Sequence, residues 1–216
     1  VFNSAVTDWG WVSGIAVYST VDGSFKRVIS TGGTGRFVST GVTRSVVSGT
    51  ETLSDNITSE IGEFVKLGDG VLNVTGDSVS TDATSILNGT LKINGSFDNS
   101  TARVSSGATL AGAGIVGGII NNGNLEPGNS IGTLNVSGTV ALNSGSVLVI
   151  EVDAAGNNDK IVATGAVTAG GTLRVSPASG TYSNGQQYTI ITGSSVSGTF
   201  STVTVLSCTG TASASY

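Results

Sequence analysis

The stretch Gly70-Val71-Leu72-Asn73-Val74-Thr75-Gly76 decides the fold, because its apolar side chains alternate with polar ones between two glycines. This alternation predicts a β-strand with one buried face. The same pattern, a glycine followed by Thr or Val, Leu, any residue, and Val or Ile, returns at 89–95, 132–138 and 171–177. Copies of one short strand therefore span about half of the chain.

The copies are separated by close to one or two units of about 20 residues. Segments 107–114 and 145–152 supply strands in between, which gives five steps of about 20 residues from Leu72 to Leu173. A β-pattern repeated at this length is typical of a solenoid, in which each repeat forms one coil. The alternative is a β-sandwich, but its antiparallel strands recur every 8–12 residues and have no reason to repeat one motif. We predict an all-β fold, a parallel β-helix with about 20 residues per coil.

The composition of the 216 residues agrees with this prediction. Glycine occurs 33 times, proline occurs twice, and charged residues make up only 11% of the chain. Glycine adopts the positive φ angles of tight corners, and β-branched residues favour strands. Because the mean hydropathy is positive, the chain also differs from disordered sequences. No methionine opens it, and we expect a piece of a larger protein.

The missing residue types exclude several kinds of chemistry. The chain has no histidine, so it cannot form a Ser-His-Asp relay or an imidazole metal site by itself. Its single cysteine, Cys208, forms neither an internal disulfide nor a CxxC site. The net charge of −5 and the scatter of the nine basic residues argue against nucleic acid as a partner. We expect no enzymatic activity, no cofactor and no metal ion.

Residues 64–76 and 86–95 resemble the passenger-associated transport repeat of bacterial autotransporters, the proteins of type V secretion. That repeat reads K-x-G-x-G-x-L-x-L-x-G, a spacer, and I-x-x-G-x-L-x-V-x-G, and Lys66 begins the first block here. The spacer at 77–85 lacks the Tyr-Ser-Gly-Gly that is usual in the family, so we expect a different corner there.

A more specific match covers 107–134 and continues at 148–153, 158–161, 171–175 and 188–191. It is similar to the segment just before the autochaperone coils near the C-terminal end of an autotransporter passenger. Its most specific part is the run Glu126-Pro127-Gly128-Asn129-Ser130-Ile131-Gly132. The residues that we expect to form the folding motif are Gly112, Gly114, Asn122, Gly123, Pro127, Gly128, Asn129, Ser130, Leu134 and Leu173.

The resemblance implies a right-handed parallel β-helix that is exported through the bacterial outer membrane and is displayed on the cell surface or secreted. It implies a cleaved signal peptide and a C-terminal outer-membrane barrel elsewhere in the full gene. The partners would be the passenger's own coils and that barrel, and a host or bacterial surface ligand is a further candidate. The segment would fold first and template the other coils, since solenoids fold by propagation and non-local parallel pairing is slow.

The same comparison divides the chain into four parts. We expect N-terminal β-helix coils at 1–63, passenger-associated repeat coils at 64–106, and autochaperone-like coils at 107–208. Residues 209–216 are small and polar, and we expect a frayed tail.

Two motifs can be interpreted either as functional sites or as purely structural features. Residues 112–117 match the dinucleotide-binding motif GxGxxG. That motif requires a helix after the glycines, but 118–123 predict a strand and a turn. We therefore interpret the glycines as corners. Glu151 and Asp153 share a strand face and could serve acid–base chemistry or bind calcium. We interpret them instead as a solvated strand end before the turn at 154–159.

Trp9 and Trp11 also share one strand face. Exposed, they could stack on sugar rings as a surface-binding site; buried, which we favour, they would fill the first coils. The first functional hypothesis is a folding nucleus and stalk of a passenger. The alternatives are an adhesin or secreted effector module that binds a cell surface, and a polysaccharide-acting enzyme, against which the lack of a dense acidic cluster argues.

Overall fold

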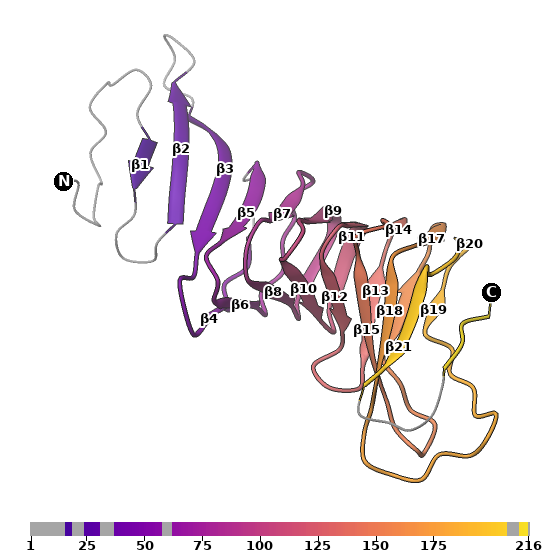
Figure 1. The fold of residues 1–216 in the computed structure, drawn as a ribbon. Coiled ribbons are helices and arrows are strands. Elements are labelled where there is room, and N and C mark those ends of the chain that lie inside the picture. The colour runs from indigo at the N-terminus through magenta and orange to yellow at the C-terminus, as the bar shows by residue number, and fades with distance from the viewer. Residues whose placement is uncertain (1–15, 19–23, 31–36, 58–61, 207–211, 216) are drawn as a thin grey trace.

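The described part of the chain consists of short β-strands that stack along a rod and contains no helix (Figure 1). A computed structural model describes residues 16–18, 24–30, 37–57, 62–206 and 212–215. The strands form two sheets, of eight and thirteen strands. No helix able to cross a membrane occurs among the described residues.

The smaller sheet has the order β21-β18-β15-β12-β10-β8-β6-β4. Its strands are parallel throughout. They are β4 (Thr50–Leu53), β6 (Val71–Val74), β8 (Thr90–Ile93), β10 (Thr109–Gly112), β12 (Asn124–Pro127), β15 (Val147–Val152), β18 (Thr172–Pro177) and β21 (Thr202–Val205).

The larger sheet has antiparallel pairs only where β2 meets β1 and β3. Its main path runs β1-β2-β3-β5-β7-β9-β11-β13-β16-β19, and β14, β17 and β20 form a branch that begins at β11. Its strands are β1 (Ala16–Tyr18), β2 (Ser24–Ser30), β3 (Phe37–Ser45), β5 (Glu63–Leu67), β7 (Thr84–Ile86), β9 (Ser96–Val104), β11 (Ile115–Asn121), β13 (Thr133–Val136), β14 (Val140–Leu142), β16 (Lys160–Ala163), β17 (Val167–Ala169), β19 (Ile191–Thr192) and β20 (Val196–Gly198).

From β3 to β12, each coil passes once through the larger sheet and once through the smaller one. The long strand β11 pairs with β13 near its start and with β14 near its end, so the larger sheet divides into two walls at this point. From there each coil has three strands, for example β16, β17 and β18. Because equivalent strands of successive coils pair in parallel, the all-β class is confirmed and the architecture is that of a parallel β-helix. The predicted boundaries at 63, 106 and 208 stay predictions.

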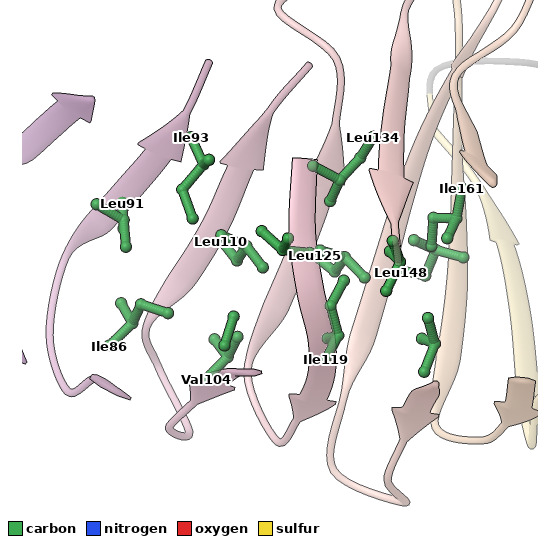
Figure 2. Packing of buried hydrophobic residues seen from close by; sticks show 14 of the residues in the cluster. Ile86, Leu91, Ile93, Val104, Leu110, Ile119, Leu125, Leu134, Leu148 and Ile161 are labelled. Atoms are coloured by element: carbon green, nitrogen blue, oxygen red, sulfur yellow. The ribbon is translucent and has the colours of Figure 1, made fainter. Parts of the chain in front are cut away.

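A ladder of leucines fills the wall formed by the smaller sheet. Leu91, Leu110, Leu125 and Leu148 follow one another along the rod (Figure 2). Strand register extends this row to Leu72 at one end and to Leu173 at the other. All six side chains are almost completely excluded from solvent. The alternation read from single strands therefore repeats as one continuous apolar row.

One leucine was assigned to the wrong wall by the repeat pattern. The pattern places Leu134 in the same series as Leu72 and Leu173, but Leu134 lies in β13 of the larger sheet, opposite Ile161. Leu125 occupies the place in the leucine ladder instead. The error has a physical cause, since any inward-facing strand that begins directly after a corner shows the same local pattern. The local sequence pattern does not specify which wall the strand belongs to.

Replacing Leu173 with Ala should lower the free energy of unfolding by about 2–5 kcal/mol, because it removes a fully packed side chain and leaves a cavity. Leu173 is 3% exposed, whereas its neighbour Arg174 points to solvent. Arg174→Ala is therefore the matched control and should change stability by less than about 0.5 kcal/mol. Urea unfolding of the three proteins measures the difference, and equal losses for both variants would contradict the ladder.

Candidate functional site

The variable part of the coils is one stack of loops at a single corner, where the chain passes from the smaller sheet to the larger one. This corner has nine residues after β4 and β6, two after β8 and β10, five after β12, seven after β15 and thirteen after β18. From β8 onward, the other corners have two to four residues. We call 128–132, 153–159 and 178–190 the corner loops; they leave the same side of the rod near its C-terminal end (Figure 1). In solenoids, insertions gathered on one face often form the functional surface.

A polar recess lies beside the first corner loop, on the outer face of the smaller sheet. It has a volume of about 370 Å³, and a second recess of about 570 Å³ continues from it along the sheet. The hollow exists because Ala111, which has a short side chain, lies in register between Lys92 and Glu126. Glu151 and Asp159 line its other side. The lining therefore carries three carboxyl groups and one ammonium group.

Gly112 and Gly114 lie where the chain turns between β10 and β11. Gly112 has a φ of 111°, and a Cβ atom on it would lie 2.2 Å from the Ile93 carbonyl oxygen. A Cβ atom on Gly114 would lie 2.2 Å from the Gly95 carbonyl oxygen. These distances are too short for any side chain, so successive coils touch backbone to backbone here. The interpretation as a corner holds for Gly112 and Gly114, which end β10 and precede β11, whereas Gly117 lies within β11.

The Pro-Gly-Asn-Ser run begins the first corner loop. Pro127 is buried and pairs with Gly112, and the Gly128 amide donates to the Gly112 carbonyl oxygen at 2.8 Å. Asn129 and Ser130 are exposed. The Asn129 side-chain amide donates to Asn94 Oδ1 at 2.7 Å. Asn94 in turn donates to Asn73 Oδ1 at 2.7 Å, so side-chain amides link three coils along this edge.

The other predicted motif residues lie elsewhere. Asn122 and Gly123 form the corner between β11 and β12, where Asn122 Oδ1 accepts a hydrogen bond from Asn143 at 2.8 Å. Leu134 and Leu173 lie in the interior, on different walls. The structure therefore brings Gly112, Gly114 and the Pro-Gly-Asn-Ser run together at one corner and separates them from the remaining motif residues. Their role in folding stays a prediction.

Asp159 is the residue of this site that the sequence did not single out. Its side chain is only 2% exposed, and its two oxygens accept hydrogen bonds from the Gly132 amide at 2.9 Å and the Glu151 amide at 2.8 Å. Burial raises the pKa of Asp159 from 3.8 to about 6, and the carboxylates of Glu151 and Glu126 add to the rise, while the two amide hydrogen bonds oppose it. The only signal in the sequence was its place in the block at 158–161.

The predicted pair of acids does not form a shared site. Glu151 is exposed on the outer face of β15, whereas Asp153 follows the end of that strand. Asp153 accepts hydrogen bonds from the amide and the side chain of Asn157, at 2.8 and 2.7 Å. These bonds lower the pKa of Asp153. The interpretation as a strand end before a turn therefore fits the geometry. Among the residues that the structure describes, no group of three His, Cys, Asp or Glu side chains could hold a metal ion.

The tryptophan prediction concerns residues outside the described part of the chain. Trp9 and Trp11 both lie within 1–15. Their assignment to a surface-binding site or to the interior therefore stays a prediction.

No family model matches this chain. It is 37% identical over 117 residues to a protein of Serratia marcescens named extracellular serine protease. The match covers 53% of this chain and 11% of that protein. The similarity is to an extracellular protein, in agreement with the expected secretion.

The comparison also corrects one prediction. The composition led us to expect no enzymatic activity, but the relative is a protease by name. The missing histidine excludes a histidine relay within these 216 residues and says nothing about a longer protein. The prediction that this protein has no enzymatic activity is therefore wrong.

Gly112→Ala should destabilise the chain more than Gly107→Ala, although both glycines have positive φ. A Cβ atom on Gly107 would meet nothing within 4 Å, so that variant should lose about 1–2 kcal/mol from backbone conformation alone. Gly112→Ala should lose about 1–3 kcal/mol more, because its Cβ overlaps the carbonyl of Ile93. Thermal or urea unfolding measures both. Equal losses would show that the close contact between coils does not matter.

Proposed function

We propose that this chain is the β-helical, C-terminal part of a secreted autotransporter-type passenger, in which coils between residues 102 and 173 fold first and support folding and export across the outer membrane. The support comes from the sequence resemblance, from the parallel coils and from the similarity to an extracellular protein. The observation that carries the proposal is a change in the interior along the rod.

Among the described residues, the interior holds nearly as many polar as apolar side chains at or before residue 100, and it is mostly apolar between residues 102 and 173. Of the 28 buried hydrophobic side chains, 20 lie beyond residue 100. Of the ten buried polar or charged side chains, seven lie at or before residue 100. Both counts refer to the residues whose exposure is described. Since buried apolar area is the main source of stability, we expect the coils between residues 102 and 173 to be the more stable ones.

Lys66 shows what the N-terminal interior requires. Its side chain is fully buried, and Nζ donates to the carbonyl oxygens of Leu67 at 2.9 Å, Gly68 at 2.7 Å and Asn88 at 3.1 Å. Burial lowers the pKa of Lys66, and the carboxylate of Asp69 opposes this effect. The ammonium group holds two successive corners together, but it also carries a desolvation cost that an apolar side chain would not.

The equivalent position becomes apolar in the following coils. Strand register places Arg44, Lys66, Ile86 and Val104 in one row. Arg44 forms an ion pair with Glu51, which occupies the position in register with Leu72 of the leucine ladder. Charged side chains thus occupy both walls at the N-terminal end. In the following coils, apolar side chains occupy the equivalent positions. A gradient of this kind favours folding that starts in the later coils and propagates toward residue 44.

Replacing Leu134 with Asp in the full-length protein should reduce its display or secretion by more than about tenfold. The side chain is fully buried, and an unpaired buried carboxylate costs several kcal/mol. Flow cytometry with an antibody against an N-terminal epitope measures display. Asn135→Asp is the matched control, because Asn135 is exposed on the same strand, and it should leave display unchanged. Normal display of Leu134→Asp would refute the folding role.

We also propose that the longer protein carries a serine protease activity, which the similarity to the Serratia protein favours. If a histidine relay is used, its histidine comes from outside these 216 residues, which contain none. The β-helix would then hold the catalytic part away from the cell.

The full-length protein should therefore hydrolyse peptides and react covalently with an organophosphorus reagent directed at activated serines. The 216-residue chain, tested in parallel, shows whether any of this activity resides in the β-helix itself. Peptide hydrolysis and mass-spectrometric mapping of the labelled serine provide the readout. A folded full-length protein that neither cleaves peptides nor takes up the label would refute this candidate function.

A further inference from the structure

The first corner loop, 128–132, is held from two directions. At its start, the Gly128 amide donates to Gly112, and Asn129 donates to Asn94, both in earlier coils. At its end, the partners come from the following coil: the Gly132 carbonyl oxygen accepts from the Lys160 amide at 2.9 Å. The Gly132 amide donates to Asp159 Oδ1. The second half of the loop therefore depends on residues that come almost thirty positions later in the chain.

We propose that Asp159 is a positioning residue that fixes the 128–132 loop from the following coil, so that this loop takes its folded shape only when β16 has paired with β13. The proposal deepens the folding role proposed above, because it names the contact by which one coil sets the corner of its predecessor. Three features suit Asp159 to this role: its hydrogen bonds to Glu151 in its own coil, its contact with Gly128, and the charges around it.

Asp159 is held in place by hydrogen bonds at the base of the second corner loop, where residues 151–152 lie beside 158–159. The Asp159 amide donates to the Glu151 carbonyl oxygen, and the Glu151 amide donates back to Asp159 Oδ2, both at 2.8 Å. An antiparallel bridge between Val152 and Asn158 closes the base of this loop. The carboxyl group is thus held by its own coil before it meets the loop. Its second oxygen remains directed at the Gly132 amide.

The contact with the loop is close on the other side as well. A Cβ atom on Gly128 would lie 2.7 Å from Asp159 Oδ1, so the loop backbone rests directly on the carboxyl group. The second and third corner loops are joined in the same manner. Asn158 donates to the Thr189 carbonyl oxygen at 3.0 Å, and Tyr188 donates to the Asp153 carbonyl oxygen. Side chains therefore connect all three corner loops in series.

The charges around Asp159 make this contact sensitive to pH. Strand β15 contributes Glu151, β12 contributes Glu126, and β8 contributes Lys92 at the far side of the recess. The next residue, Lys160, is half-buried. Burial first, and then the two glutamates, raise the pKa of Asp159 to about 6 in the folded chain, against an ordinary value of 3.8.

The sign of the pH effect follows from this rise. The folded chain binds the Asp159 proton more tightly than the unfolded chain does, so protonation stabilises the fold. This contribution is complete below about pH 4 and is lost as the pH rises through about 6. We therefore expect this contribution to stability to be largest below about pH 4 and to be absent well above pH 6.

The first test compares the 216-residue chain with Asp159→Asn and with the control Asp55→Asn, which changes an exposed aspartate. Between pH 4 and 7, the unfolding constant of the wild-type chain should rise by about tenfold or more relative to that of Asp159→Asn. Asp55→Asn should follow the wild type. Urea unfolding at several pH values measures this difference. Parallel pH profiles for all three proteins would overturn the proposal.

The second test measures proteolytic cleavage within 128–132 under native conditions. Asp159→Ala should raise the cleavage rate by about tenfold, because the Gly132 and Glu151 amides lose their acceptor. Asp159→Asn, which keeps one acceptor oxygen, should lie in between, and Asp55→Asn should match the wild type. Equal rates in all variants would overturn the positioning role. If Asp159→Ala does not fold, Asp159→Asn decides. Since both tests use the isolated chain, their failure would leave the display test of Leu134→Asp unaffected.

Discussion

The backbone spacing between parallel coils is the constraint on which the rest of this structure depends. Paired strands lie about 4.8 Å apart, so each residue meets its equivalent in the next coil. Where the chain turns, the coils approach so closely that Gly112 and Gly114 have no room for a Cβ atom. Along the walls, the same spacing stacks leucine on leucine from Leu72 to Leu173. Glycine at corners and apolar residues on walls are thus two consequences of one distance.

Polar groups that enter this stack must find partners, and the two ends of the described coils do so differently. Lys66 is paired with three carbonyl oxygens inside the N-terminal coils. Asp159 accepts two amide hydrogen bonds at the corner-loop stack. Each group holds two coils together, and each has a pKa shifted toward its neutral form by burial. The polar contacts therefore fasten the corners, while the apolar ladders supply the stability of the walls.

The candidate site could be foreseen only in part. The Pro-Gly-Asn-Ser run was singled out by its resemblance to the segment before the autochaperone coils of autotransporter passengers, and in the structure it begins the first corner loop. Asp159 could not be identified in this way, since an aspartate in a turn is ordinary and its burial results from Gly128 and Glu151 lying against it. Leu134 was placed on the wrong wall, because its strand has the same local pattern as the leucine ladder. In each case the missing information was contact between coils.

The sequence by itself determined the all-β class, the parallel coils and their average length, because alternation within strands and glycine at corners are local properties that repeat. It also determined that no histidine relay lies within these residues. Only the tertiary structure decided which wall each strand joins, that extra residues gather at one corner, and that Asp159 is buried there. These features depend on residues from different coils, whose separation along the chain varies, so no fixed spacing in the sequence encodes them.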